Sequence, residues 1–296
     1  MPNNKNEIEI SIMQSTDYAL LPNPSSIVGL HNPSHGAQIP DPISLNRFKT
    51  LNGFGFIFLT PSPLLIDFIE SEAHSGAVLM EVGAGFGNTP IEALKRNIDM
   101  YTANDISEEH LDILKARALQ AFQSDKGIDL KKLQLLCGKA PNFLPKFREY
   151  YDAILIDKTL HFFTPDEVED FLRWAYEALK PQGHIYILTI SPYILCYREK
   201  VLPFYMQNKE ENSLFPGYIP DADSYLREEG KADTTYCVPK NMLFFTLEDL
   251  CSLLEKRGFT IEKTYSISLP SEDKPDWTEV LPEESSLVGL KVQKKL

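Results

Sequence analysis

Short apolar runs alternate with amphipathic segments along most of this chain, and this alternation constrains its fold more than any other feature. The runs are short enough to be buried strands, and the segments between them space their apolar residues as helices do. The run AILI at 153–156 is apolar on both faces, as a central strand of a parallel sheet is. Alternation of this kind builds a mostly parallel sheet with helices on both faces. Strands are expected at residues 77–80, 100–103, 133–136, 153–156, 184–190, 259–266 and 287–292.

Helix start signals stand between several of these runs. The segment TPDEV at 164–168 has a capping threonine, a proline at the first helical position and a glutamate three residues after the cap. The segment TPIE at 89–92 has the same arrangement, so a helix is expected to begin there with Thr89 as its cap. A further capped helix is expected from Thr246 to Gly258.

Two stretches lie outside the alternation. Residues 1–59 carry turn-forming clusters and no amphipathic period, so we expect an irregular N-terminal cap before a domain that spans 60–296. Residues 196–245 interrupt that domain with aromatic side chains set among proline, glycine and charged residues. Long segments without a regular pattern are usually functional lids or disordered, and we expect this one to be a substrate-lid insertion.

The composition is that of an ordinary soluble globular protein, with 43% hydrophobic and 24% charged residues. Lys and Arg total 29 and Asp and Glu total 42, and the net charge of −13 disfavours nucleic acid as a partner. No apolar run approaches the roughly 18 residues of a membrane helix, and the first residues lack the pattern of a secretory signal. Four dispersed cysteines without a CxxC pair indicate a reducing compartment, so the expected location is the cytoplasm.

The segment EVGAGFG at 81–87 lies between the first predicted strand and its helix. Glycines at alternate positions allow the backbone to pass close to a ligand, and the following helix N-terminus favours an anionic group. Asp105 ends the second strand, 24 residues after Glu81, where a carboxylate can accept hydrogen bonds from ribose hydroxyls. The layout predicts a site for a nucleotide-containing cofactor.

Two cofactor classes use such a layout. Dinucleotide enzymes require GxGxxG, whereas this chain has GxGxG with an acidic residue two positions before the first glycine. That pattern resembles the class I S-adenosylmethionine-dependent methyltransferases. The resemblance covers about residues 60–296 and implies a Rossmann-like, doubly wound α/β fold with a mostly parallel seven-stranded sheet and an antiparallel last strand. It rests on six segments in order, at 81–87, 104–107, 138–140, 151–157, 160–162 and 179–183.

The resemblance implies S-adenosyl-L-methionine as cofactor. Asp105 would bind the ribose hydroxyls and Ile106 would pack on one adenine face. Many members place an aspartate where this chain has Lys139, and an ammonium group cannot accept a hydrogen bond from the adenine amino group. That contact must therefore come from the backbone or from another side chain. The complete set of cofactor contacts expected from the resemblance is Glu81, Gly83, Ala84, Gly85, Gly87, Asp105, Ile106, Lys139, Ala140 and Asp157.

Two positions near the fourth strand allow more than one interpretation. Asp157 would bind the cofactor or the substrate, or would ligate a divalent metal as in catechol-type methyltransferases. No metal site is expected, because the sequence shows no second cluster of metal ligands. Leu160-His161 resembles the small-molecule O-methyltransferases, in which a histidine after this strand is the general base. The alternative for His161 is a structural histidine that is hydrogen-bonded to the backbone.

The expected reaction is transfer of a methyl group from S-adenosylmethionine to an oxygen or nitrogen atom of a small molecule by in-line displacement. The size of the lid segments and the acidic charge favour this acceptor class. A first alternative is a methyltransferase of protein or nucleic acid, although DKTL at 157–160 stands where adenine N6 enzymes have their Asn/Asp-Pro-Pro-Tyr signature. A second is a cofactor-binding protein without catalysis, or an NAD-type oxidoreductase.

Overall fold

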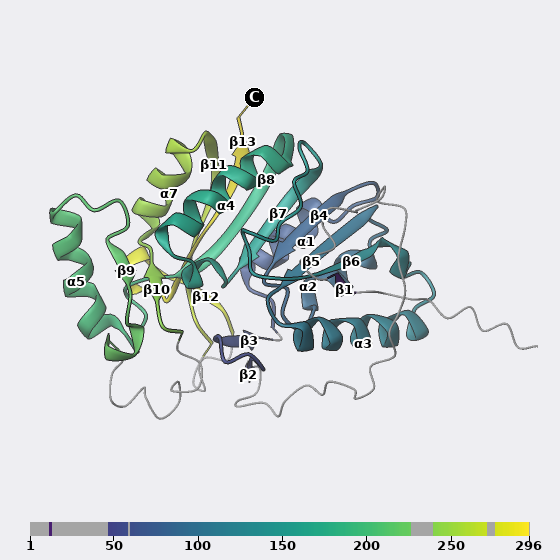
Figure 1. Ribbon diagram of the computed structural model, residues 1–296, viewed down its shortest axis with the longest axis horizontal. Coiled ribbons are helices and arrows are strands. Elements are labelled where there is room, and N and C mark those ends of the chain that lie inside the picture. The colour runs from purple at the N-terminus through teal and green to yellow at the C-terminus, as the bar shows by residue number, and fades with distance from the viewer. Residues whose placement is uncertain (1–11, 14–46, 59, 226–238, 271–275, 296) are drawn as a thin grey trace, which may run out of the picture.

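The computed structural model describes residues 12–13, 47–58, 60–225, 239–270 and 276–295. A nine-stranded sheet forms its centre (Figure 1). The strands of this sheet are β1 (Ile12–Met13), β4 (Val78–Val82), β5 (Met100–Asp105), β6 (Leu133–Cys137), β7 (Tyr151–Asp157), β8 (Leu179–Ile190), β11 (Phe259–Ser268), β12 (Thr278–Glu279) and β13 (Leu287–Lys294). Across the sheet they follow the order β1-β6-β5-β4-β7-β8-β13-β11-β12.

The pairing confirms the expected architecture. The strands from β6 to β8 are parallel to one another, and β13 lies antiparallel between β8 and β11. The expected count of seven strands was wrong, because the short strands β1 and β12 extend the two edges of the sheet. Each is two residues long, and so short a segment leaves no periodic signal in a sequence.

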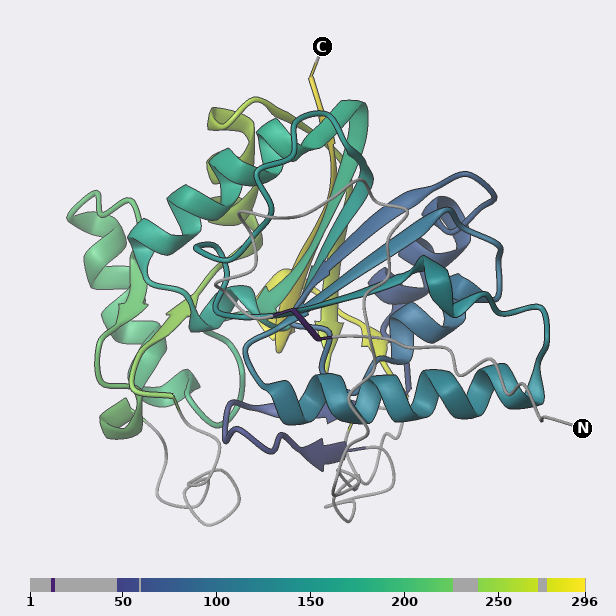
Figure 2. The ribbon, with the colours of Figure 1, turned by 45° about the vertical axis from the view of Figure 1, so that its right-hand side comes forward.

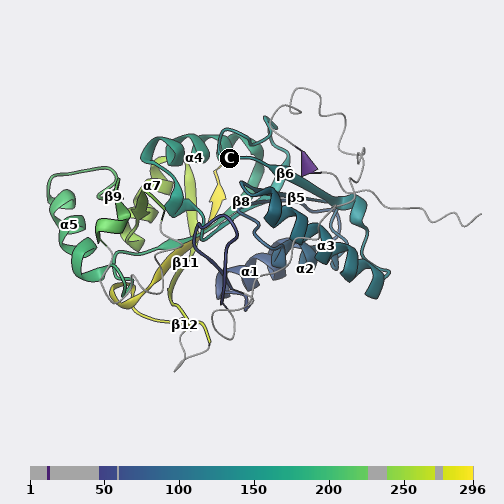
Figure 3. The same cartoon turned by 60° about the horizontal axis from the view of Figure 1, so that its bottom comes forward.

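Helices cover both faces of the sheet (Figures 2 and 3). On one face lie α1 (Pro63–Glu72), α2 (Asn88–Leu94) and α3 (Glu108–Ser124), and on the other lie α4 (Pro165–Ala178) and α7 (Leu247–Lys256). Side chains of a strand point alternately to the two faces. Accordingly Leu79 of β4 packs in the core beneath α1 to α3, whereas Met80 and Val82 pack beneath α4 and α7.

Two of the three predicted helix caps are confirmed. Thr164 and Glu167 form a reciprocal capping box at the start of α4, with bonds of 3.3 and 3.0 Å. The Thr246 hydroxyl accepts a hydrogen bond from Asp249 N at the start of α7. Both helices therefore begin where their sequence signals place them.

The predicted cap of α2 was wrong. The residue before α2 is Gly87, in the left-handed conformation, and no side chain caps this helix. Thr89 lies inside the first turn, where its hydroxyl donates to Glu81 at 3.2 Å. The sequence pattern of a capping box was present, but the threonine is used by the carboxylate at the end of β4.

The remaining elements lie around the sheet. The hairpin of β2 (Arg47–Lys49) and β3 (Phe56–Phe58) lies below the sheet in Figure 1, and the short helix η3 (Leu160–Phe162) follows β7. At the left of Figure 1 are α5 (Arg198–Glu210) and the two-stranded sheet of β9 (Gly217–Ile219) and β10 (Met242–Phe244). Three further 3-10 turns are η2 (Leu130–Lys132), η4 (Ala222–Tyr225) and η5 (Pro282–Glu284).

The predicted insertion, residues 196–245, contains regular structure that its sequence did not indicate. Its helix α5 buries Val201 and Tyr205, and Tyr197 packs edge-on against Phe244 at 5.3 Å. These aromatic side chains belong to the core on the α1 side. Residues 226–238 of the insertion, and most of the predicted cap at 1–59, lie outside the described residues. In the described part of the chain, no helix has the length and apolar character required to span a membrane.

Candidate active site

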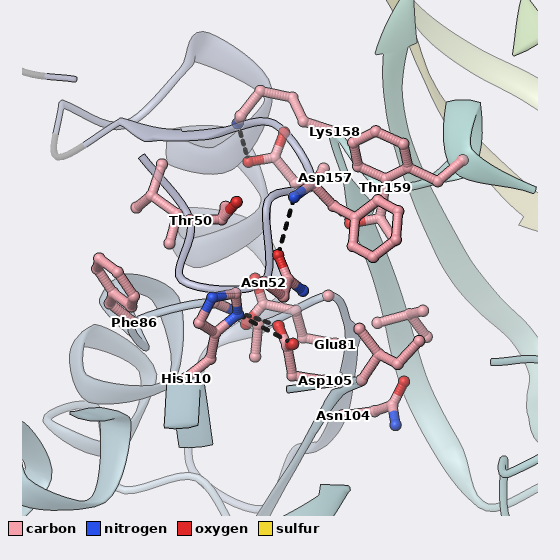
Figure 4. A pocket seen from close by; sticks show the side chains of 18 of the residues that line it. Thr50, Asn52, Glu81, Phe86, Asn104, Asp105, His110, Asp157, Lys158 and Thr159 are labelled. Carbon is pink, nitrogen blue, oxygen red and sulfur yellow. Dashed lines mark hydrogen bonds and ion pairs between the residues drawn. The ribbon is translucent and has the colours of Figure 1, made fainter. Parts of the chain in front are cut away.

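A cavity of about 460 Å³ lies at the carboxyl ends of β4, β5 and β7 (Figure 4). Ligands of open α/β sheets bind at this edge, because the loops that follow the parallel strands meet there. The hairpin β2–β3, η3, the start of α1 and residues 138–140 and 239–241 also contribute to the wall. The structure brings together at this cavity every residue that the sequence predicted as a cofactor contact: Glu81, Gly83, Ala84, Gly85, Gly87, Asp105, Ile106, Lys139, Ala140 and Asp157.

The loop between β4 and α2 requires glycine because of the side chains that pack against it. Gly83 and Gly87 have φ angles of +82° and +79°, in the left-handed region. A Cβ at Gly83 would lie 2.0 Å from Thr159 Oγ1, and a Cβ at Gly87 would lie 2.2 Å from Leu114 Cγ. At these two positions, packing within the protein therefore excludes larger residues, where the sequence had suggested close approach to a ligand.

Asp105 at the end of β5 is 5% exposed and is held in one orientation. Its Oδ2 accepts a hydrogen bond from Gly85 N at 2.8 Å, and its Oδ1 accepts one from Ser107 N at 2.9 Å. His110 Nδ1 lies 3.1 Å from the same Oδ1 (Figure 4). Hydrogen bonds to an ionised carboxylate are among the strong ones in proteins. The carboxylate is thus fixed in direction at the cavity wall.

Glu81 at the end of β4 is buried at the floor of the cavity. Tyr101 donates its hydroxyl to Oε2 at 2.9 Å, and Thr89 donates to Oε1 at 3.2 Å. Burial raises the pKa of the Glu81 carboxyl to about 8, against the opposing effect of the Tyr101 hydrogen bond, and the negative charge of Asp157 raises it further. Glu81 therefore holds a proton near neutral pH and is poised to lose it beside a positive charge.

Asp157 at the end of β7 has one paired and one unpaired oxygen. Its Oδ2 forms an ion pair with Lys158. Its Oδ1 is buried and finds no hydrogen-bond partner among the described residues. An unsatisfied buried polar atom costs about 1–3 kcal/mol. A ligand that brings a hydrogen-bond donor to Oδ1 would remove this cost.

Ile106 and Lys139 lie at the rim of the same cavity. The Ile106 side chain is 48% exposed, which leaves an apolar surface facing the pocket. Lys139 forms an ion pair with Glu167 of α4. Its charge is therefore balanced from within the protein, and the neighbouring Ala140 is buried beside it.

His161, the predicted base, is placed differently. It lies in η3, is 6% exposed and is not among the residues that line the cavity, although Phe162 and Phe163 are. Burial lowers the pKa of His161 to about 3, and the charge of Lys158 lowers it further. The imidazole is therefore neutral, and its Nδ1 has no hydrogen-bond partner in the part of the chain that the structure describes.

Sequence reasoning missed two features of the site. His110 lines the cavity from the first turn of α3, where Ser107 caps the helix. The spacing from the Ser107 cap was a usable signal, since it places His110 beside the end of the preceding strand. The second feature is an aromatic wall formed by Phe54, Phe56 and Phe58 of the hairpin, which lies in the segment predicted to be irregular.

Among the described residues, no group of three or more His, Cys, Asp or Glu side chains is arranged to bind a metal ion. The other two interpretations of Asp157 are a contact with the cofactor and a contact with the substrate. The unpaired Oδ1 suits a donor from either of them.

Residues 80–185 match the methyltransferase domain family. This span begins in β4, ends in β8 and contains the glycine loop together with Asp105 and Asp157. Residues 80–185 are therefore similar to a methyltransferase domain. This match agrees with the methyltransferase family that the sequence resemblance implied.

Solved structures share the fold of this chain. An S-adenosylmethionine-dependent methyltransferase from Mesorhizobium loti superposes with a TM-score of 0.52 at 16% identity, over 78% of this chain and 96% of that chain. One from Methanosarcina mazei gives a TM-score of 0.52 at 18% identity, over 77% of this chain and 97% of that chain. No curated protein sequence matches this chain.

Proposed function

We propose that this methyltransferase acts on a small-molecule acceptor with a largely apolar body, at an oxygen or nitrogen atom. The observation that carries the proposal is the division of one cavity into two chemically different parts. Its floor has the carboxyl groups of Glu81, Asp105 and Asp157, and its outer wall is aromatic. The floor suits a cation that carries a ribose, and the wall suits an apolar acceptor.

The residues at the floor fit S-adenosylmethionine. Asp105 would bind the ribose hydroxyls, and Ile106 would offer its exposed side chain to the adenine face. The unpaired Oδ1 of Asp157 would accept from the ammonium group of the methionine part. Glu81 would lose its proton there, because a nearby positive charge favours the carboxylate. The glycine loop and Ala140 would complete the contacts.

Methyl transfer places specific demands on the chain. When bound, the cofactor supplies an activated methyl group on a sulfonium. The protein must align the acceptor atom with that methyl and exclude water, and alignment can account for about 7–11 kcal/mol of a barrier. Phe54 and Phe162 both line the cavity and contact each other with ring centroids 5.9 Å apart, so the hairpin and η3 together enclose one side of it. This contact supports a lid role for the N-terminal segment.

Two of the three described lysines that line the cavity are paired with carboxylates, and this favours a small acceptor over a macromolecule. Lys139 and Lys158 are both paired with carboxylates, on Glu167 and Asp157. A nucleic-acid substrate would require unpaired basic charge around the opening. From the predicted lid at 196–245, the described residues that line the cavity are 239–241, and these include the exposed Lys240. The net charge of −13 also favours a small acceptor over a nucleic acid.

Isothermal titration calorimetry with S-adenosylhomocysteine and with NAD tests the proposal at the cofactor level. We expect micromolar or tighter binding of S-adenosylhomocysteine and none of NAD. A transfer assay with labelled S-adenosylmethionine against apolar phenols, amines and carboxylic acids, and against denatured protein and RNA, then tests the acceptor class. Transfer to the macromolecules alone would overturn the small-molecule proposal.

The candidate base needs its own test. If His161 removes the acceptor proton, His161→Asn lowers kcat at least tenfold, because general-base catalysis contributes about 10²–10⁴-fold, while the Kd of S-adenosylhomocysteine stays unchanged. His161 is buried and is not among the residues that line the cavity, which favours the structural alternative. If His161 is a structural histidine, His161→Asn retains kcat and changes only Tm. Steady-state kinetics with the identified acceptor distinguish the two roles, and His74→Asn on the surface is the control.

A further inference from the structure

His110 lies between two elements that are far apart in the sequence. It is 2% exposed at the start of α3. On one side the backbone N–H of Leu51, in the turn between β2 and β3, donates to His110 Nε2 at 3.0 Å. On the other side His110 Nδ1 lies 3.1 Å from Asp105 Oδ1 (Figure 4).

These two contacts define the tautomer of His110. A backbone N–H can only donate, so Nε2 must be the unprotonated acceptor, and the ring proton of the neutral imidazole is then on Nδ1. Nδ1–H donates to the carboxylate of Asp105, and Oδ2 of the same carboxylate accepts from Gly85 N at 2.8 Å. A continuous chain of hydrogen bonds therefore runs from the hairpin through His110 and Asp105 to the glycine loop.

The hairpin is also attached to the same region by packing. Phe48 and Ile57 pack with Phe86 and Ile113 in a small cluster of their own. Phe86 meets the His110 ring edge-on at 5.4 Å. The imidazole is thus enclosed by the elements it connects, and a change in the position of the hairpin must change its surroundings.

We propose that His110 is a positioning residue that couples closure of the β2–β3 hairpin to the orientation of the Asp105 carboxylate for the ribose. The inference rests on the proposed ribose contact of Asp105. Coupling of this kind is reciprocal, since a cofactor that favours the oriented carboxylate also favours the closed hairpin. Cofactor binding would then complete the aromatic wall at which the acceptor binds.

Two substitutions separate the two contacts of His110. Asparagine places an amide near the position of Nδ1, so His110→Asn keeps a donor to Asp105 and loses the acceptor for Leu51 N–H. Glutamine places its amide near the position of Nε2, so His110→Gln keeps the acceptor for Leu51 and loses the donor to Asp105. Thermal unfolding identifies which variants are folded before any ligand is added.

The readouts are the Kd of S-adenosylhomocysteine and hydrogen exchange of amides 47–58. In the wild type we expect S-adenosylhomocysteine to slow exchange of the hairpin amides. In His110→Asn the Kd should stay within about twofold while the hairpin no longer responds to the ligand. In His110→Gln the Kd should rise at least fivefold, the lower end of typical coupling effects, while Leu51 N–H stays protected. A histidine that only fills space would not separate these readouts.

A second variant tests the coupling without changing His110. Phe48→Ala loosens the hairpin packing, so it should raise the Kd at least fivefold in the wild-type background and have no such effect in His110→Asn. Unchanged Kd values in folded His110→Gln and Phe48→Ala would overturn the inference. Absence of S-adenosylhomocysteine binding to the wild type would overturn the proposed function, and this inference with it.

Discussion

Asp105→Asn is expected to weaken binding of S-adenosylhomocysteine by about 10- to 100-fold. The carboxylate accepts bonds from Gly85 N and Ser107 N and lies beside His110 Nδ1, so its direction at the cavity is fixed before the ligand arrives. An amide has one acceptor oxygen where a carboxylate has two. Loss of hydrogen bonds to a charged group is worth about 1.5–3 kcal/mol, which corresponds to this change in Kd.

Calorimetry on Asp105→Asn measures this effect directly. Asp125→Asn removes the same charge from an exposed position after α3 and is the matched control. Circular dichroism verifies that both variants are folded. A wild-type Kd in folded Asp105→Asn would contradict the ribose assignment and leave the fold assignment intact.

Glu81→Gln is expected to weaken S-adenosylmethionine binding and to remove its dependence on pH between about 6 and 8. The pKa of Glu81 is raised to about 8, mainly by burial, so the free enzyme holds this proton at pH 7. A cationic ligand favours the carboxylate, so binding should release a proton, and the affinity should increase as pH rises toward 8. Above pH 8 the carboxylate forms without the ligand and the dependence ends.

The raised pKa of Glu81 also determines how the stability of the folded protein changes with pH. The folded pKa of Glu81 lies above the value of 4.5 for an unperturbed glutamate, so the wild type loses stability relative to Glu81→Gln as pH rises from about 4.5 to 8. Calorimetry in two buffers of different ionisation enthalpy counts the released protons, and urea unfolding at pH 5 and pH 8 measures the stability difference. Glu92→Gln, on the exposed side of α2, is the control. Binding without proton release at pH 7 would contradict the prediction.

The order of strands and the edge that holds the site could be predicted because long-range packing left its pattern in the sequence. Runs such as 153–156 are apolar on both faces only because helices cover both faces. The carboxyl ends of β4, β5 and β7 then had to meet, which is why Glu81, Asp105 and Asp157 line one cavity. The sheet edges could not be predicted, because β1 and β12 are defined by pairing and not by composition.

The details that the sequence did not predict depend on which of several local partners a side chain takes. Thr89 had the pattern of a helix cap, yet it donates to Glu81, which tertiary structure places nearby. His110 had the pattern of an ordinary first-turn residue, yet its ring bridges Asp105 and Leu51, which precedes it by 59 residues. Choices of this kind are decided by neighbours in space, and a single sequence gives no direct signal of them.

The aromatic wall and the acidic floor of the cavity come from separate stretches of the chain. Phe54, Phe56 and Phe58 precede β4 in the chain, whereas the carboxyl groups of Glu81, Asp105 and Asp157 lie at the ends of β4, β5 and β7. Under the proposed function, exchange of residues 47–58 between related methyltransferases would alter the acceptor and leave the adenosyl contacts unchanged. Acceptor specificity could then change in evolution through the β2–β3 hairpin alone, provided that the backbone N–H at position 51 still donates to His110.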